Sequence, residues 1–415
     1  MENLVEIAIK GKSGWFEQRC RNVVFKVLKQ INYGSLEVIE GHNKTQFGQS
    51  AGQIAPGDSE QELSAKLVVH DPSIYRDLVL KGSIGAGEAY MAGKWSSPDL
   101  TAVIRIFARA QQMTDQLESG KNWFKRFQLV LLHWANRNNK AGAQKNIAAH
   151  YDLGNELYSR FLDPQMIYSS AIYPKPQASL SQAQQHKLET ICQRLELKED
   201  EHLLEIGSGW GGLAIYAALY YGCKVTTTTI SREQYQYARE QIDKLGLGGQ
   251  ITLLQKDYRE LTGQYDKLVS IEMIEAVGYD YLESFFRQCN LRLKSGGKML
   301  LQSITIADQR FDYYRNNVDF IQRYIFPGGF LPSITEIARR SQIHTDMVIE
   351  KIDDIGLHYA KTLAHWREQF LDSWRELTEL GYDENFKRLW LYYFGYCEGA
   401  FLERAISTVQ VVFRK

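Results

Sequence analysis

A run of glycines directly after an apolar stretch is the first feature of this chain that could do chemistry. Residues 202–206 read as a buried strand, and Gly207, Gly209 and Gly212 follow it at the spacing G-x-G-x-x-G. Glycine lets a backbone turn come into contact with a ligand, and a helix that starts after such a turn presents N–H groups to it. The spacing alone fits a dinucleotide site or a site for another nucleotide-like ligand.

The residues at the ends of the neighbouring strands decide between these ligands. A dinucleotide site would need an acidic residue near the end of the second strand, but that strand ends at Thr229 and Ile230. Instead Glu205 lies two residues before the first glycine, and Asp257 follows the third strand. This order of residues resembles class I S-adenosylmethionine-dependent methyltransferases.

Strand-like and helix-like segments alternate through the second part of the chain. This alternation predicts an α/β fold with a mostly parallel, doubly wound sheet that binds its ligand at the carboxyl ends of the strands. The resemblance makes that sheet seven-stranded and Rossmann-like. Residues 1–135 read as a smaller α+β domain, 136–146 as a polar linker and 147–415 as the catalytic domain. The further strands of the sheet are expected at 224–230, 251–255, 267–271 and 298–304.

The composition is that of an ordinary globular protein. The chain has 415 residues, 44% of them apolar and 24% charged, and its formal net charge is zero. This balance gives no general attraction to nucleic acid, so no nucleic-acid partner is expected. No apolar run reaches the roughly 18 to 20 residues that cross a bilayer, and the first residues do not resemble a signal peptide. We therefore expect a cytoplasmic protein with reduced cysteines and no metal site.

Six dispersed motifs narrow the resemblance to one family. Their sequences and order resemble the cyclopropane fatty acid synthases. A segment near the start, 82–95, is similar to the amino-terminal domain of the long bacterial synthases. The six motifs lie at 150–155, 162–171, 209–212, 272–278, 324–333 and 358–363.

The cofactor that this resemblance implies is S-adenosylmethionine. Glycines allow close approach of the backbone, and the end of the second strand is expected to face the ribose and adenine. The resemblance places one pair of residues over the amino-acid end of the cofactor and another pair beside the adenine. The expected cofactor-binding residues are Gly207, Gly209, Gly211, Thr229, Ile230, Gln234, Tyr168, Ser169, Asp257 and Tyr258.

The resemblance also implies the reaction and a proton acceptor. Methyl transfer to a carbon–carbon double bond leaves a positive charge on the acyl chain, which aromatic faces can stabilise. In this family a bound bicarbonate is held to take the proton that is then lost. Carried over by position, its partners are Glu275, Ile304 and Tyr359, whereas Ser170 stands where the family has cysteine and Gln302 where it has histidine.

These two departures leave more than one function open. The implied reaction forms a cyclopropane ring on the unsaturated acyl chain of a membrane phospholipid, at the inner face of the membrane. A related fatty-acyl methyltransferase would instead leave a methyl or methylene branch. A non-catalytic lipid-binding protein and a small-molecule methyltransferase are alternatives of other classes. Homodimer formation is suggested by analogy with the long synthases.

Two further segments carry expectations about lipid. Residues 101–150 place basic side chains beside apolar ones at helical spacing, which is typical of a lipid-surface helix or of a buried interdomain helix. Residues 386–394 read as an aromatic helix that lines an acyl channel or packs in a core, and 408–413 read as an edge strand. A charged residue at Phe394 is expected to abolish lipid turnover and to leave cofactor affinity unchanged.

Overall fold

The computed structural model describes residues 14–48, 63–110 and 154–415. The chain divides into two compact units: unit 1 comprises 1–128 with 376–405, and unit 2 comprises 129–375 with 406–415. The expected linker, most of the basic segment 101–150, and the motif residues His150 and Tyr151 lie outside the described residues. Across the described ranges, helices that combine the length and the apolar character needed to cross a membrane are absent.

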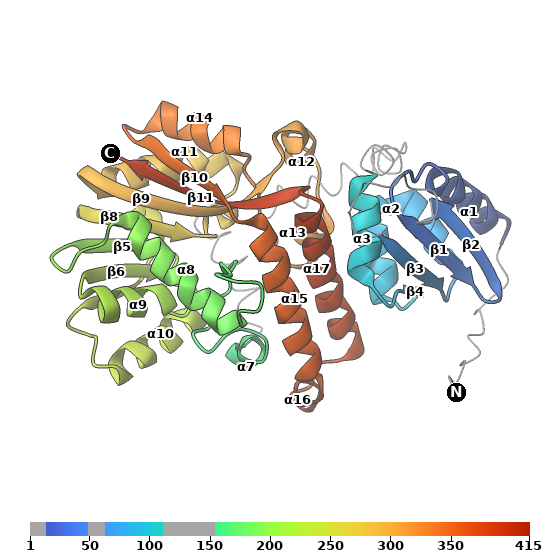
Figure 1. Cartoon of the computed structure of the whole chain (residues 1–415), viewed down its shortest axis with the longest axis horizontal. Helices are drawn as coiled ribbons and strands as arrows, with labels where there is room; N and C mark the ends of the chain where they lie inside the picture. The colour runs from blue at the N-terminus through green and yellow to red at the C-terminus, as the bar shows by residue number, and fades with distance from the viewer. Residues whose placement is uncertain (1–13, 49–62, 111–153) are drawn as a thin grey trace. The chain divides into compact units, whose positions relative to one another are not determined.

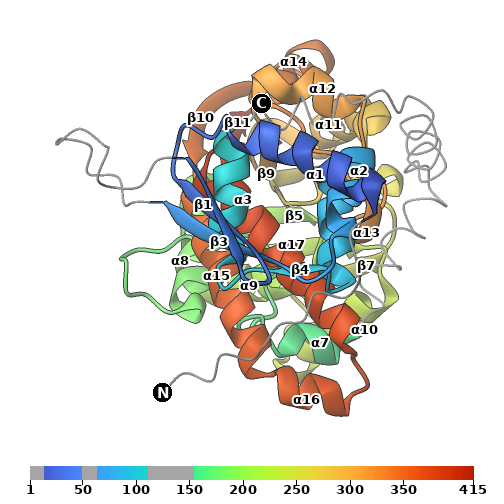
Figure 2. The ribbon, with the colours of Figure 1, turned by 90° about the vertical axis from the view of Figure 1, so that its right-hand side faces the viewer.

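Unit 1 is a small α+β fold whose strands and first helices are seen in Figure 2. Its four-stranded sheet has the order β2-β1-β3-β4, in which β1 runs antiparallel to β2 and parallel to β3. Helix α3 packs on β1 and β3, and α1 packs on α2. These elements are α1 (Trp15–Leu28), β1 (Ser35–Glu40), β2 (Asn43–Gly48), β3 (Ser64–Val69), α2 (Ser73–Met91), β4 (Trp95–Ser96) and α3 (Leu100–Arg109).

The aromatic helix near the carboxyl terminus, α17 (Glu384–Leu402), also belongs to unit 1. It packs on α3 and α2, and Thr101 Oγ1 donates a 2.9 Å hydrogen bond to Glu398. A Cβ atom at Gly399 would lie 2.8 Å from Ile104 Cγ2, so glycine allows this close approach. The sequence assigned this helix to the catalytic domain, whereas its contacts group it with the amino-terminal elements. That it lines an acyl channel stays a prediction.

Unit 2 contains the seven-stranded sheet (Figure 1). The strand order is β10-β11-β9-β8-β5-β6-β7, and β11 runs antiparallel to both of its neighbours. The strands are β5 (His202–Ile206), β6 (Lys224–Thr229), β7 (Ile251–Gln255), β8 (Tyr265–Ile271), β9 (Leu293–Ile306), β10 (Val348–Asp354) and β11 (Ile406–Arg414). The helices are α7 (Asn155–Ser159), α8 (Leu180–Leu195), α9 (Gly212–Tyr221), α10 (Arg232–Lys244), α11 (Leu282–Arg292), α12 (Phe311–Arg315), α13 (Phe320–Tyr324), α14 (Ile334–His344) and α15 (Gly356–Asp372), and α16 (Trp374–Glu379) spans the end of the first segment of the unit.

Each face of this sheet is covered by its own apolar layer. Leu203 of β5 joins a cluster with α8, α9 and α10, whereas the next residue, Leu204, joins a cluster with α11 and α14. Side chains alternate between the two faces of a strand, so consecutive buried leucines require helices on both sides. This arrangement confirms the doubly wound α/β fold expected from the sequence.

The structure differs from the sequence prediction at one edge of the sheet. Residues 408–413 were expected to form an edge strand, but β11 lies between β9 and β10. The edge strand on that side is β10, most of whose side chains are exposed or partly exposed. Its sequence, VIEKIDD, carries charged residues that hide the alternation from which strands are recognised.

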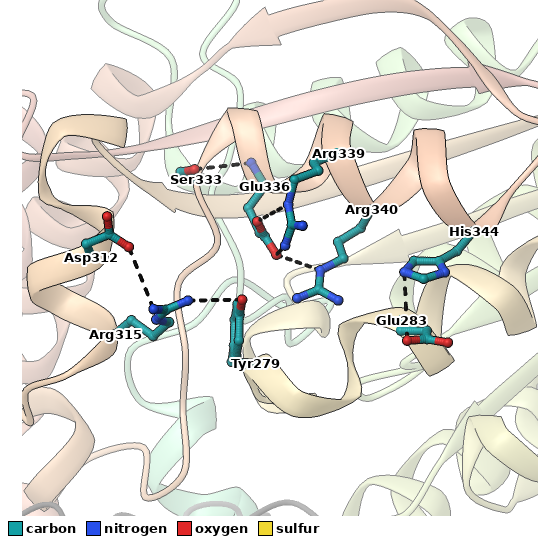
Figure 3. Close-up of polar contacts among 9 residues, drawn as sticks. All are labelled: Tyr279, Glu283, Asp312, Arg315, Ser333, Glu336, Arg339, Arg340 and His344. Atoms are coloured by element: carbon teal, nitrogen blue, oxygen red, sulfur yellow. Dashed lines mark hydrogen bonds and ion pairs between the residues drawn. The ribbon is translucent and has the colours of Figure 1, made fainter.

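A charged cluster fixes helix α14 beside the loop that follows β8 (Figure 3). Ser333 caps the helix by accepting from the backbone N–H of Glu336 at 3.2 Å. The Glu336 carboxylate is 5% exposed and accepts hydrogen bonds from Arg339 and Arg340. The Arg340 guanidinium also lies over the ring of Tyr279, 5.0 Å from its centroid. The cluster therefore ties α14 to the segment that carries the site residues after β8.

Candidate active site

A pocket in unit 2 lies at the carboxyl ends of four neighbouring strands. Its wall is formed by the residues that follow β5, β6, β7 and β8, together with Met166 to Ser169 and one face of α8. This is where a doubly wound sheet binds its ligand. The residues named from the sequence that line it are Tyr168, Ser169, Gly207, Gly209, Thr229, Ile230, Gln234, Asp257 and Tyr258.

The glycine turn after β5 has positive φ angles, which residues other than glycine adopt only with strain. Gly207, Gly209 and Gly211 have φ of 99°, 50° and 93°. The N–H groups of Gly207 and Ser208 both donate to Thr228 O, at 3.1 and 2.9 Å, which holds the turn against β6. Gly211 is not among the pocket-lining residues of the described chain; a Cβ atom there would lie 3.1 Å from Ala238 Cβ. Gly211 therefore serves the packing of the turn on α10.

The polar residues after β6 and β7 are fixed by one another. Thr229 Oγ1 donates to Gln234 Oε1 at 2.8 Å, which orients the Gln234 amide at the start of α10. Asp257 accepts from Arg259 Nε at 2.8 Å and Nη2 at 2.6 Å. These contacts hold both segments ready at the pocket wall, as a nucleoside site requires.

The segment before α8 brings two residues to the pocket. Asp163 accepts the N–H of Ile167 at 2.9 Å, and Met166 takes the left-handed φ of 56° between them. Ser169 accepts a 2.7 Å hydrogen bond from the ammonium of Lys187, a fully buried lysine of α8. Burial lowers the pKa of Lys187 to about 8, while the charges of Glu272 and Asp163 oppose that shift.

An aromatic cluster surrounds Tyr168 at the pocket wall. The ring centroids of Tyr158 and Trp366 lie 5.3 and 5.1 Å from that of Tyr168, and those of Phe161 and Phe326 lie 6.1 and 6.5 Å away. Aromatic faces attract a nearby cation by about 2 kcal/mol when water is excluded. Tyr168 is the member of the cluster that lines the pocket, where its ring suits a ligand or an intermediate with positive charge.

Three of the predicted catalytic residues converge on a carboxylate that the sequence analysis did not select. Glu272 Oε1 accepts from the Ser170 backbone N–H at 2.9 Å and from Gln302 Nε2 at 2.7 Å. Glu272 Oε2 accepts from the Tyr359 hydroxyl at 2.9 Å. Glu272 itself lines the pocket, whereas these three residues lie behind it. Ser170 contributes its backbone, because its hydroxyl donates to Ala171 O.

A chain of polar side chains sets the orientation of the Gln302 amide. Arg194 donates to Gln410 Oε1, and Gln410 Nε2 donates to Gln302 Oε1 at 2.8 Å. Because its oxygen is engaged in this way, Gln302 presents its NH2 group to Glu272. Gln302 and Gln410 are fully buried, so this orientation is not exchanged with water.

Glu275 is held separately from this group. Its Oε1 accepts from the Ile304 N–H at 2.5 Å and from Ser303 Oγ at 3.2 Å, while Oε2 is buried and has no hydrogen-bond partner. Burial, reinforced by the charge of Glu272, raises the pKa of Glu275 to about 8. Glu275 is therefore largely a neutral acid at neutral pH.

Residues 100–411 match the family model of mycolic acid cyclopropane synthetase. The chain belongs to this family. Cyclopropane-fatty-acyl-phospholipid synthase of Escherichia coli strain K12 is 40% identical over 353 residues, which are 85% of this chain and 88% of that protein. Tuberculostearic acid methyltransferase of Mycobacterium tuberculosis is 37% identical over 352 residues, which are 83% of this chain and 82% of that protein.

Solved structures of the cyclopropane synthetase family share the fold. The cyclopropane synthase MmaA2 from Mycobacterium tuberculosis has a TM-score of 0.61 and 27% identity, and the match covers 66% of this chain and 98% of that chain. A mycolic acid cyclopropane synthase, CmaA1, complexed with SAH and CTAB, matches with the same TM-score at 26% identity. These matches confirm the class I methyltransferase fold and the family predicted from the motifs. The chain is an S-adenosylmethionine-dependent methyltransferase.

The residues of this family member do not fit a bound bicarbonate. The groups expected to donate to that ion were at Ser170, Gln302, Ile304 and Tyr359. Each of these positions already donates to a protein carboxylate, three of them to Glu272 and Ile304 to Glu275. A further anion would also be repelled by the negative charge of the Glu272 carboxylate.

Two pocket residues of this methyltransferase, Glu272 and Lys187, were missed in the sequence. Glu272 was included only in the motif 272–278 and not among the candidate site residues. A carboxylate directly after a buried strand is nevertheless a signal for a site. Lys187 lies on the face of α8 that also carries Gln184, Leu188 and Ile191. It is the single charged residue among these four. A single charge on such a face is the signal that could have found it.

Proposed function

We propose that this methyltransferase transfers the methyl carbon of S-adenosylmethionine to the cis double bond of an unsaturated acyl chain in a membrane phospholipid and closes a cyclopropane ring. The observation that carries the proposal is the 40% identity to the phospholipid synthase of Escherichia coli over 85% of this chain. The donor supplies an electrophilic methyl group on a sulfonium. The residues of the pocket orient it and exclude water.

The aromatic cluster around Tyr168 supports this chemistry. A double bond is a weak nucleophile, and its methylation leaves a cation on the acyl chain. The Tyr168 ring lines the pocket, where an aromatic ring stabilises positive charge without offering a strong nucleophile to it. The buried rings of Tyr158, Phe161 and Trp366 pack around it.

A second product class is supported by a specific observation. Tuberculostearic acid methyltransferase is nearly as similar to this chain as the phospholipid synthase, at 37% identity. If a hydride shifts within the cation before the proton is lost, the product is a methylene branch in place of a ring. The cation formed in the pocket is the same for both products.

The proposal includes where the enzyme meets its substrate. We propose that it works in the cytoplasm, bound peripherally to the inner face of the membrane, and that it forms a homodimer. Phospholipid acyl chains lie in the bilayer, so an enzyme that modifies them must bind at the membrane surface. Sedimentation with phospholipid vesicles and measurement of the mass in solution test these two points.

The reaction is tested with purified enzyme, S-adenosylmethionine and vesicles of cis-unsaturated phospholipid. We expect acyl chains that gain one CH2 group and resist mild hydrogenation, because a ring contains no double bond. Vesicles of saturated phospholipid are the matched control and should give no product. A gain of CH2 with retained unsaturation would favour the methylene product. Methylation of soluble amines with none of lipid would contradict the proposal.

A further inference from the structure

Glu272 lines the pocket in a backbone conformation that is uncommon for a residue other than glycine. Its φ is 48°, a left-handed conformation that costs a non-glycine residue of order 1 kcal/mol. Its carboxylate is enclosed by three hydrogen-bond donors, and its own N–H donates to Gln302 O at 2.8 Å. Strain of this kind persists only where the surrounding structure holds it, and it concentrates at functional positions.

The position of Glu272 gives its carboxylate access to a bound ligand. It directly follows β8 at the carboxyl end of the sheet and lines the pocket together with Gly207 and Tyr168. We propose that the Glu272 carboxylate is the resident base that takes the proton lost by the transferred methyl group. This inference rests on the proposed function and names the group that completes it.

The proposed step balances without a further reactant. The π electrons of the double bond form a new bond to the methyl carbon, while the bond from that carbon to sulfur breaks and leaves its electron pair on sulfur. The neighbouring acyl carbon is then a cation. Glu272 accepts a proton from the new methyl group, and the released C–H electron pair closes the three-membered ring. The proton passes to solvent during turnover.

The charged groups that face Glu272 suit it to this role. Burial and the negative charge of Glu272 both raise the pKa of Glu275, on the short helix Ile274–Ala276, so the pair favours Glu272 as the member that carries the charge. Lys187, from α8, adds a positive charge, and the Tyr359 hydroxyl of α15 donates to the carboxylate. Burial raises the pKa of Glu272, and the hydrogen bonds from Ser170, Gln302 and Tyr359 together with the charge of Lys187 oppose that rise.

Two variants and one change of buffer test the assignment. Glu272→Gln keeps the shape of the side chain but cannot accept the proton, and we expect turnover of lipid to fall at least about 100-fold. Glu272→Gly accepts the positive φ without strain and leaves the donors of Ser170, Gln302 and Tyr359 open. Formate or bicarbonate added to this variant should then restore part of the activity. Wild-type enzyme should keep full activity in buffer freed of carbon dioxide.

The controls distinguish a misfolded variant and a wrong substrate from a wrong assignment of Glu272 as the base. Both variants should bind S-adenosylmethionine in calorimetric titration, and Glu240→Gln, an exposed carboxylate of α10, should behave as wild type. Full lipid turnover by Glu272→Gln would overturn the assignment. So would a wild-type enzyme that stops without carbon dioxide and recovers with bicarbonate. A wild-type enzyme that never modifies lipid would instead overturn the proposed function.

Discussion

At the scale of single residues, the positive φ of Gly207 makes the glycine turn sensitive to a single methyl group. A Cβ atom at this position would lie 3.1 Å from Met273 Cβ, and the φ of 99° is strained for any other residue. We expect Gly207→Ala to lower the free energy of unfolding by about 1 to 2 kcal/mol and to weaken S-adenosylmethionine binding about tenfold. Thermal unfolding and calorimetric titration measure the two effects.

Gly246 offers a matched control for this variant. Its φ is 69°, and a Cβ atom there would meet nothing within 4 Å. Gly246→Ala therefore isolates the backbone strain from the contact with Met273, and it should leave cofactor affinity unchanged. Equal losses of affinity in both variants would show that the effect of Gly207→Ala is general destabilisation.

We expect the Tyr359 hydroxyl to influence the pKa of Glu272 through its hydrogen bond, without touching the substrate. Burial raises the pKa of Glu272, and the hydrogen bonds from Ser170, Gln302 and Tyr359 oppose that rise. Tyr359→Phe removes one of them, so the pKa of Glu272 should rise further. Because the base acts only when ionised, the acid limb of the profile of kcat against pH should move to higher pH. A lower kcat with an unmoved limb would contradict this role.

The residues of the site were predictable in part. The glycine turn, Thr229, Gln234 and Asp257 were selected because each lies at or after the end of a recognisable strand, and they line one pocket because strand ends meet at one edge of a parallel sheet. The partners of Glu272 were named as well, but from their family positions, as holders of an external ion. Which atom a hydrogen bond reaches depends on side-chain packing, which strand order and spacing do not determine.

At the scale of elements, the strands that are buried on both faces were predicted most closely. The predicted 202–206 matches β5, and the predicted 224–230 exceeds β6 by one residue. Such strands carry continuous apolar or β-branched runs that stand out in the sequence. The exposed strand β10 carries no such run and was missed. The grouping of α17 with unit 1 could not be predicted from the sequence either, because the apolar face of a helix can pack against any apolar surface.

The cluster around α14 makes a prediction about stability at this scale (Figure 3). Burial alone would raise the pKa of Glu336, but hydrogen bonds from Arg339 and Arg340 hold it below its usual range. Glu336→Gln should lower the free energy of unfolding by about 1 to 2 kcal/mol at neutral pH, because it leaves two guanidinium groups with a neutral partner.

The pH dependence of this loss follows from the direction of the shift. The folded pKa of Glu336 lies below that of the unfolded chain, about 4.3. Its contribution is therefore complete above that value and is lost as the pH falls through the folded pKa. Denaturation with urea at several pH values should show the variant and wild type converging in acid. Asp243→Asn, which breaks an exposed pair with Arg239 on α10, is the control and should cost at most about 0.5 kcal/mol.

At the scale of the whole molecule, the chain passes between its two units more than once. Unit 1 contains residues 376–405, and the chain then returns to unit 2 to form β11 within the seven-stranded sheet. Every residue that lines the cofactor pocket belongs to unit 2. Cofactor binding should therefore stabilise unit 2 in particular, by about 2.7 kcal/mol when S-adenosylmethionine is present at 100 times its Kd.

Phe394 allows this separation of the units to be tested. It is fully buried in unit 1, with its ring centroid 5.6 Å from that of Trp390. Phe394→Glu places a charge in that core, which costs several kcal/mol, and we expect it to unfold unit 1 and abolish lipid turnover. Affinity for S-adenosylmethionine should change less than about twofold, because the pocket shares no residue with this core.

Scanning calorimetry with and without cofactor measures both parts of this expectation. The Phe394→Glu variant should retain a cofactor-sensitive transition and lose the other, whereas Phe394→Leu, which keeps the core apolar, should retain both. The reason is that each unit has its own apolar core, and unfolding is cooperative within a core. If the variant lost cofactor affinity together with lipid turnover, the two units would unfold as one cooperative body. The segment 376–405, through which the chain leaves unit 2 and returns to it, would then couple the two units.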